Sequence, residues 1–274
     1  MAKPLKLVAA NDTFGALLAV TDALAGKNAL FITAPETNGL MPEVHGLPDE
    51  VDDSVAFIVE SSGSTGSPKR IELSAAAALG SAKASADRLG GSGQWLLALP
   101  INYIAGLNVL IRSAVAETQP VMMNTALSFT AESFVRHTSM LRAEKKFTAL
   151  VPTQLSRLAT AVEVENAMDE SGSATLGALR SFDAILVGGQ STAPQLISSL
   201  RDLGVNIVET YGSAETFGGV IYDGQPIDGV NYKILEDSRI EISSPTLANE
   251  FARENKIIMS DLGEIAHGKL RVLG

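Results

Sequence analysis

Cysteine is absent from this 274-residue chain, so that disulfides, zinc–thiolate sites and cysteine nucleophiles are excluded. No run of apolar residues approaches the roughly 20 that a membrane helix needs. The start of the chain, "MAKPLKLVAANDTF", also lacks the long apolar stretch of a secretory signal. These absences favour a cytoplasmic enzyme or binding protein without a membrane span.

Positive charge is scarce, because 21 Lys and Arg residues face 31 Asp and Glu residues, which gives a net charge of −10. Nonspecific binding of nucleic acid depends on clustered cations, so no nucleic-acid partner is expected. A single nucleotide could still bind through local backbone dipoles. The hydrophobic share of 46% is typical of a globular protein with a substantial core.

Predicted strands and helices alternate up to about residue 212, which indicates a mostly parallel sheet with covered faces. Short, closely spaced strands follow, and they predict a small antiparallel or barrel-like β-rich sub-lobe. We therefore expect a layered α/β portion over residues 1–212 and a sub-lobe of the same domain over 213–274. Length alone leaves two small domains as the alternative.

Three helices of the α/β portion are predicted with specific ends. Ser74 is expected to cap an Ala-rich helix that runs to about residue 89. A second helix is expected over 131–146. A third is expected after a Thr153 cap, since apolar residues recur there at helical spacing.

A loop rich in glycine and hydroxyl residues, "SSGSTGSPKR", follows the apolar segment "SVAFIVE" at residues 61–70. Such a loop can turn several N–H groups toward one anion, and Lys69 adds a mobile positive charge. It is not a Walker loop, because Pro68 stands in place of the second glycine and Arg70 in place of the Ser or Thr that holds magnesium. Composition alone leaves a flexible surface turn as the alternative.

Two further segments, "LVGGQ" and "VETYGSAET", also stand at the carboxyl ends of predicted strands. Ligands of open α/β sheets bind at such ends. Tyr211 offers a flat face to an adenine, Gly212 permits close approach, and Glu215 can hold Mg²⁺. Taken singly, Tyr211 as a packing residue and Glu215 as a solvated charge are the simpler interpretations.

Together these segments resemble the adenylate-forming superfamily of acyl- and aryl-CoA ligases, luciferases and adenylation domains. "SSGSTGSPK" is similar to the phosphate loop of that family, and "YGSAE", "SDLGEIAHGKLRVLG" and "LPINYIAGL" are similar to three later family segments. The resemblance covers about residue 55 to the end. Arg70, Ala214 and Tyr103 depart from the residues common in the family, which are Gly, Thr and, in many members, His.

Three segments are most similar to the o-succinylbenzoate–CoA ligases of menaquinone biosynthesis: "VPTQLSRL", "LVGGQ" and "YGSAETFGGVIYDGQPIDGV". The resemblance implies the large α/β domain of adenylate-forming enzymes. It also implies ATP-dependent activation of a carboxylic acid, with o-succinylbenzoate expected, and then transfer to coenzyme A. ATP, Mg²⁺ and coenzyme A are the implied cofactor and co-substrates, and a small carboxylate is the partner.

Site residues carried over from the family fall into four groups. The phosphate-binding group is Ser61, Ser62, Gly63, Ser64, Thr65, Gly66 and Lys69. The second nucleotide-binding group is Gly188, Gly189, Gln190, Tyr211 and Gly212 at the adenine, Asp261 at the ribose, and Ser213 and Ala214 elsewhere on the nucleotide. The acid-binding group is Leu99, Tyr103, Gly106, Gln154, Gly218 and Gly219. Thr65, Lys69 and Glu215 are the expected catalytic residues, with Glu215 as the metal ligand.

Family members carry a smaller C-terminal lid domain, which begins where this sequence stops, at Gly274. The resemblance therefore implies a chain without the lid and incomplete for catalysis. Two alternatives stay open: a ligase for a different aryl or acyl acid, and a nucleotide-binding homologue without chemistry. A homodimer is a further open expectation.

Overall fold

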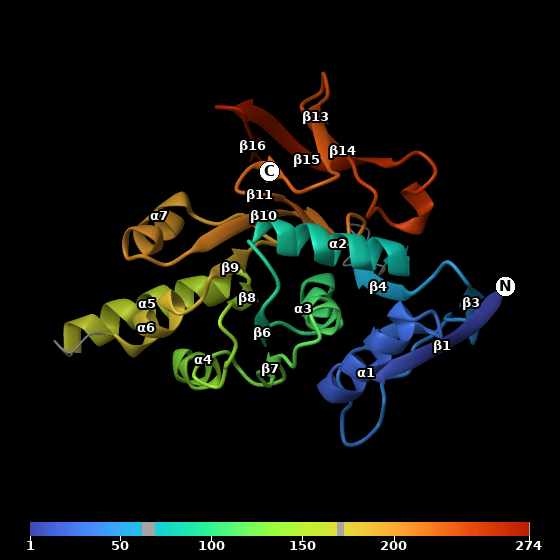
Figure 1. Ribbon diagram of the computed structural model, residues 1–274, viewed down its shortest axis with the longest axis horizontal. Helices are drawn as coiled ribbons and strands as arrows, with labels where there is room; N and C mark the ends of the chain where they lie inside the picture. The colour runs from blue at the N-terminus through green and yellow to red at the C-terminus, as the bar shows by residue number, and fades with distance from the viewer. Residues whose placement is uncertain (62–68, 169–172, 274) are drawn as a thin grey trace.

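The computed structural model describes residues 1–61, 69–168 and 173–273, and these form three β-sheets with helices packed between and around them (Figure 1). The first sheet has the order β3-β1-β2-β4-β5. Its central pairs β1–β2 and β2–β4 are parallel, whereas β3 and β5 pair antiparallel at the two edges. The strands are Ala2–Ala9 (β1), Ala29–Thr33 (β2), Glu50–Asp52 (β3), Phe57–Ser61 (β4) and Lys69–Leu73 (β5).

The second sheet has seven strands in the order β12-β11-β10-β9-β8-β6-β7. Strands β10, β9, β8, β6 and β7 are mutually parallel, and β11 and β12 add antiparallel pairs beside β10. The strands are Gln94–Leu97 (β6), Val121–Met122 (β7), Lys146–Leu150 (β8), Ala184–Val187 (β9), Ile207–Ser213 (β10), Gly218–Tyr222 (β11) and Gln225–Pro226 (β12).

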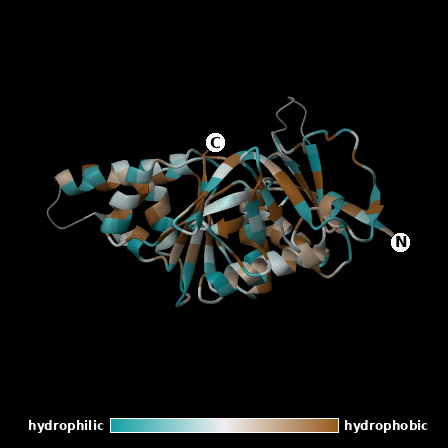
Figure 2. Ribbon diagram, turned by 90° about the horizontal axis from the view of Figure 1, so that it is seen from above, coloured by the Kyte–Doolittle hydropathy of each residue, from teal (hydrophilic) through white to brown (hydrophobic). Residues whose placement is uncertain are grey.

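Both faces of the second sheet are covered, as parallel strands require. Neighbouring residues of β6 point to opposite faces, so that Leu97 packs in the core shared with α1, α2 and α3, and Leu96 in the core shared with α4–α7. The helices are Thr13–Leu24 (α1), Ala75–Arg88 (α2), Ile104–Val115 (α3), Ala131–Thr138 (α4), Pro152–Met168 (α5), Ala174–Arg180 (α6) and Pro194–Asp202 (α7). In Figure 2 the outer helices alternate hydrophilic and hydrophobic colour along their length. Within the described ranges, no helix combines the length and the apolar character needed to cross a membrane.

The third sheet is antiparallel and has the order β13-β14-β15-β16. Its strands are Asn231–Ile234 (β13), Arg239–Ser243 (β14), Lys256–Ala266 (β15) and Lys269–Val272 (β16), and a short 3₁₀ helix, η1, covers Asn249–Phe251. The expected α/β class with a small antiparallel sub-lobe is confirmed. The division of the chain at residue 212 stays a prediction, but β11 and β12 pair within the second sheet, and the third sheet starts at Asn231.

Two of the three predicted helices have the expected start: Ser74 Oγ accepts a hydrogen bond from the Ala77 N–H at 3.1 Å and caps α2, and α4 begins at Ala131. The prediction for 131–146 was wrong at its end, because α4 stops at Thr138. Beyond it the chain turns into β8, and Gln94 Oε1 accepts the Arg142 N–H at 2.7 Å. The prediction of a Thr153 cap was also wrong, because α5 already begins at Pro152.

Candidate active site

Parallel strands β6, β8, β9 and β10 end at one edge of the second sheet, and a cavity of about 110 Å³ opens there. The cavity is bordered by α3 on one side and by the strand ends on the other. Six of the residues predicted from the sequence line it, namely Leu99, Gly188, Gly189, Gly212, Gly218 and Gly219. Predicted acid-binding and nucleotide-binding residues therefore share one concave surface.

Glycine is required at this surface because the strands approach each other closely. A Cβ on Gly212 would lie 2.0 Å from the carbonyl oxygen of Gly218, and a Cβ on Gly188 would lie 2.3 Å from Thr210 Oγ1. Neither position has room for a side chain. The cavity wall is therefore partly bare backbone, which suits close approach of a flat or phosphorylated ligand.

Tyr211 and Asp261, predicted separately to contact adenine and ribose, are hydrogen-bonded to each other. Tyr211 Oη donates to Asp261 Oδ2 at 2.8 Å across the gap between β10 and β15. Burial, together with this bond to a carboxylate, raises the pKa of the Tyr211 hydroxyl well above its ordinary value. Tyr211 therefore stays a neutral donor that orients the Asp261 carboxylate.

Glu215 lies at the tip of the hairpin between β10 and β11, two residues beyond Ser213. Among the described residues, its carboxylate has no hydrogen-bond or ion-pair partner, and no group of three or more His, Cys, Asp or Glu could hold a metal ion. Mg²⁺ typically binds one or two protein carboxylates and completes its shell with water and substrate phosphates. A single half-buried glutamate fits that donor set.

Lys69 reaches the same region through η1. Its Nζ pairs with Glu250 Oε1 at 2.7 Å, while the Ala248 N–H donates to the Glu215 carbonyl oxygen at 2.8 Å. Ala248 and Glu250 are two positions apart, so at most about 7 Å of chain separates these two contacts. Segment 246–251 therefore holds Lys69 and the hairpin that carries Glu215 on the same side of the molecule.

The same region contains buried polar atoms without a partner in the described part of the chain. Ser213 Oγ, in the predicted nucleotide segment, is one, and Asn249 Nδ2 in η1 is another. Buried polar groups are nearly always hydrogen-bonded in a complete site. Their position beside Glu215 and Lys69 is consistent with a polar ligand.

Several predicted residues occupy other positions. Gly106 is buried where a Cβ would lie 2.2 Å from the Pro100 carbonyl oxygen, and Gln154 Nε2 donates to the Ala98 carbonyl oxygen at 2.8 Å. Both tie the elements at the cavity mouth together. Tyr103, just before α3, is 55% exposed. Their contacts with a ligand stay predictions.

The structure describes three of the remaining predicted site residues, Ser61, Ala214 and Gln190. Ser61 pairs with Lys69 across β4 and β5, at the base of the predicted phosphate loop. Ala214 is half-buried against the main core, and Gln190 is exposed just beyond β9. Five residues lie outside the described ranges: Ser62, Gly63, Ser64, Thr65 and Gly66.

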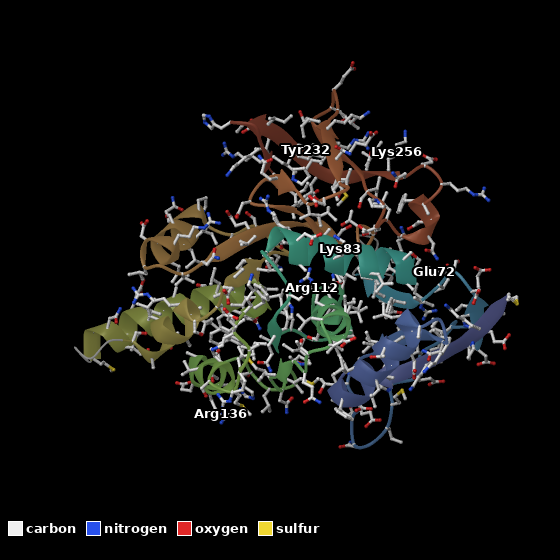
Figure 3. The ribbon with its side chains drawn as sticks, in the orientation of Figure 1. Glu72, Lys83, Arg112, Arg136, Tyr232 and Lys256 are labelled. Carbon is white, nitrogen blue, oxygen red and sulfur yellow. The ribbon has the colours of Figure 1, made fainter. Side chains whose placement is uncertain are left out.

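Arg112 is a cavity residue that sequence reasoning missed. It is 8% exposed, lines the cavity two turns into α3, and has no carboxylate partner among the described residues, where its Nε also lacks a hydrogen bond. Its Nη2 donates to Tyr222 Oη at 3.2 Å, and its guanidinium lies 4.9 Å from the centre of the Trp95 ring. Figure 3 labels it in the interior beside α2. The one available signal was an arginine within a helix that has no other charged residue.

The family model described as "AMP-binding enzyme" matches residues 8–245. A protein named "Probable 2-succinylbenzoate--CoA ligase" from Mycobacterium tuberculosis is 34% identical over 280 residues, which cover 99% of this chain and 70% of that protein. A 2-succinylbenzoate–CoA ligase from Bacillus subtilis is 27% identical over 203 residues, which cover 69% of this chain and 38% of that protein.

Solved structures share the fold. The o-succinylbenzoate CoA synthetase of Bacillus subtilis with its acyl-adenylate intermediate matches with a TM-score of 0.68, at 20% identity, over 97% of this chain and 62% of that one. The same enzyme with ATP and magnesium matches with a TM-score of 0.64, at 21% identity, over 96% and 62%. At these identities the likeness concerns the fold.

Proposed function

Because this chain belongs to the AMP-binding enzyme family, we propose that it activates a carboxylic acid with ATP and that the acid is 2-succinylbenzoate, which is then joined to coenzyme A. The mycobacterial relative of that name, at 34% identity, supports this substrate. The chain spans 70% of that relative and 38% of the Bacillus one, so the activity of the whole protein is part of the proposal.

In the first half-reaction, a carboxylate oxygen of the acid attacks the α-phosphorus of ATP, and pyrophosphate leaves with the electrons of the broken P–O bond. Such chemistry needs positioning and charge neutralisation more than a protein nucleophile. Asp261, oriented by Tyr211, would accept hydrogen bonds from the ribose hydroxyls. Lys69 would exchange Glu250 for a phosphate, and Glu215 would hold Mg²⁺, which neutralises phosphate charge when bound.

In the second half-reaction, the thiol of coenzyme A attacks the acyl carbon of the adenylate. The thioester C–S bond forms, the bond to AMP breaks, and the thiol proton is released. The bare-backbone surface around Gly188 and Gly212 would hold the AMP portion during both steps.

The choice of acid rests on Arg112. 2-Succinylbenzoate has two carboxylates, so one can react while the other must be bound elsewhere. A buried guanidinium without a carboxylate partner among the described residues is costly unless a ligand supplies the anion. Arg112 lies within the cavity, two turns of α3 from its mouth, and fits the second carboxylate of such an acid.

One observation carries the proposal: the glycines assigned to the nucleotide line the same cavity as Arg112. An acid anchored on Arg112 would thus extend toward the nucleotide. A ligase for another dicarboxylate with the same spacing is the second candidate, because Arg112 recognises charge and not the carbon skeleton.

Exchange of labelled pyrophosphate into ATP tests this function. We expect exchange with 2-succinylbenzoate and little with benzoate or butanoate, which lack the second carboxylate. The variant Arg112→Met should raise the KM for 2-succinylbenzoate at least about tenfold, the usual size of losing one charged hydrogen bond. Arg88→Met, an arginine nearby on α2 that does not line the cavity, is the matched control.

Two outcomes would contradict the proposal. Exchange that is equally fast with monocarboxylates would reject the role of Arg112, whereas ATP binding without exchange for any acid would favour a nucleotide-binding protein without chemistry. Formation of the coenzyme A thioester, measured by mass spectrometry, tests the second half-reaction separately.

Location and assembly complete the proposal. Action in the cytoplasm, where ATP and coenzyme A are available, can be checked by cell fractionation. A homodimer is a further prediction, which light scattering coupled to size-exclusion chromatography would test.

A further inference from the structure

A second cavity, of about 180 Å³, lies behind the first one. It is bordered by one face of α2, the C-terminal part of α3 and the second sheet, and it opens to the surface beside the Lys83–Asp87 ion pair of α2. Its lining includes Ala86, Ser92, Trp95, Ala116 and Phe147. Arg112 lines both cavities, and it is the one residue that their linings have in common within the described chain.

The two cavities follow each other along α3. Ile104, Ala105 and Asn108 border the first cavity, whereas Val115 and Ala116 border the second. At 1.5 Å per residue, positions 105 to 116 span about 17 Å along the helix axis. Strand β8 shows the same order, since its end at Leu150 faces the first cavity and Phe147, near its start, faces the second.

A polar wall separates them. Tyr222, which lines the first cavity, accepts a hydrogen bond from Arg112 Nη2 at 3.2 Å, and its Oη lies 3.0 Å from Oγ of Ser85, which lines the second. Tyr222 is 0% exposed, Ser85 1% and Arg112 8%. Figure 3 shows where Arg112 lies relative to Lys83 of α2, another residue of the second cavity.

We propose that Arg112, Tyr222 and Ser85 form an end wall that limits the acid to a short molecule with a charged far end. The inference rests on the proposed function, which makes the first cavity the acid site. An unbranched apolar tail that reached the wall would bury a guanidinium without an anion and is rejected. Removal of the wall joins the cavities, and the apolar part of the second lining, which includes Trp95 and Phe147, then contacts the chain of a medium-length fatty acid.

Calorimetric titration of the whole chain with hexanoate, octanoate and decanoate tests the wall. In the native protein, affinity should not increase with chain length. In Arg112→Ala, affinity should increase about fourfold for each methylene that enters the second cavity, since burial of one CH₂ has that effect on an equilibrium constant. We expect decanoate to bind at least about tenfold more tightly than hexanoate.

Matched variants locate the effect. Arg88→Ala removes an arginine that contacts the Tyr222 carbonyl but lines neither cavity, and it should keep the native length profile. Ala86→Leu, added to Arg112→Ala, fills the second cavity and should abolish the gain. Arg112→Met, which keeps an unbranched stem, replaces Arg112→Ala if circular dichroism shows that the latter does not fold.

Three results would overturn the inference. They are an affinity that already rises up to decanoate in the native protein, a flat profile in a folded Arg112 variant, and a gain that Ala86→Leu leaves intact. Because binding is measured without turnover, failure of the proposed function shows itself separately, as absence of pyrophosphate exchange with 2-succinylbenzoate.

Discussion

Tyr211 and Asp261 are 50 positions apart in the chain, yet their side chains form one unit through the 2.8 Å hydrogen bond. Because the Tyr211 pKa is raised, this hydroxyl remains a donor throughout the pH range in which proteins work. One of the two Asp261 oxygens is occupied by Tyr211, and the carboxylate keeps further acceptor capacity for a ribose.

Asp261→Asn should therefore weaken discrimination between nucleotides that differ only in their ribose hydroxyls. The native protein should bind AMP about tenfold or more tightly than 2′,3′-dideoxy-AMP, as charged hydrogen bonds contribute about 1.5–3 kcal/mol. In the variant this ratio should approach one. Fluorescence or calorimetric titration measures both constants, and Tyr232→Phe in the same small sheet is the control.

Lys69 gives a second residue-scale prediction, because its ion pair with Glu250 is half-exposed on both sides. Such a pair contributes at most about 1 kcal/mol, so a phosphate can displace the carboxylate. Lys69→Met should weaken ATP binding about tenfold and leave AMP binding almost unchanged, whereas Glu250→Gln should tighten ATP binding a few-fold. Lys256→Met, an exposed lysine of β15, serves as control, and equal losses for ATP and AMP would contradict the assignment.

At the scale of elements, α6 depends on a carboxylate from α5. Glu165 accepts hydrogen bonds from Ser173 Oγ (2.6 Å), Thr175 Oγ1 (2.6 Å) and the Thr175 N–H (2.9 Å) at the start of that helix. Burial acts to raise the pKa of the Glu165 carboxyl, but the bonds from Ser173 and Thr175 outweigh it, and the pKa lies below its ordinary value. An anion at a helix N-terminus is further favoured by the helix dipole.

Glu165→Gln should lower the free energy of unfolding by about 1–2 kcal/mol at pH 7. A carboxyl with a lowered folded-state pKa stabilises the protein above its ordinary pKa, and this contribution is lost as the pH falls through the folded-state value. The difference between native protein and variant should thus shrink below about pH 4.5, the ordinary value for Glu. Urea unfolding at several pH values measures it, and a difference independent of pH would contradict it. The neighbouring exposed Glu163→Gln is the control.

Elements with local signals were predictable, and those that depend on distant partners were not. The cap of α2 by Ser74 needs only three residues of sequence. Strand β1 was missed because its sequence contains Lys3 and Pro4, and its place depends on pairing with β2 and β3. The end of α4 was misplaced because tertiary hydrogen bonds from the 142–143 backbone to Gln94 redirect the chain.

The residues of the candidate site also differ in whether the sequence alone could predict them. Lys69, Tyr211, Glu215 and Asp261 stand in short segments that could be recognised one at a time, but their convergence through η1 and β15 could not be predicted from spacing. Arg112 has no such segment. Its importance arises from burial without a carboxylate partner in the described chain, and that is a property of α3, β6 and β11 packed together.

At the scale of the whole molecule, one of the hydrophobic clusters of the described residues joins the three sheets. It runs from Val8 in the first sheet through Leu97 in the second to Leu270 in the third, and the Phe57–Phe217 contact at 6.3 Å links β4 directly to the hairpin that carries Glu215. The candidate site is built from residues of all three sheets, so it keeps its geometry only while the three sheets stay folded together.

Residues of the first and third sheets should therefore contribute to the same unfolding transition. Leu73→Ala in β5 and Ile242→Ala in β14 remove fully buried side chains, and each should cost about 2–5 kcal/mol. The single Trp95, buried in β6 of the second sheet, reports on a sheet that contains neither substitution. Because the core is shared, both variants should shift the Trp95 fluorescence transition and the circular dichroism transition equally, to a lower temperature.

Ile265→Ala, at a 60% exposed position of β15, is the control, and it should change the free energy of unfolding by no more than about 0.5 kcal/mol with either probe. If Ile242→Ala instead split off a circular dichroism transition that Trp95 did not follow, the third sheet would unfold on its own, and Asp261 could leave the site while the second sheet stayed folded.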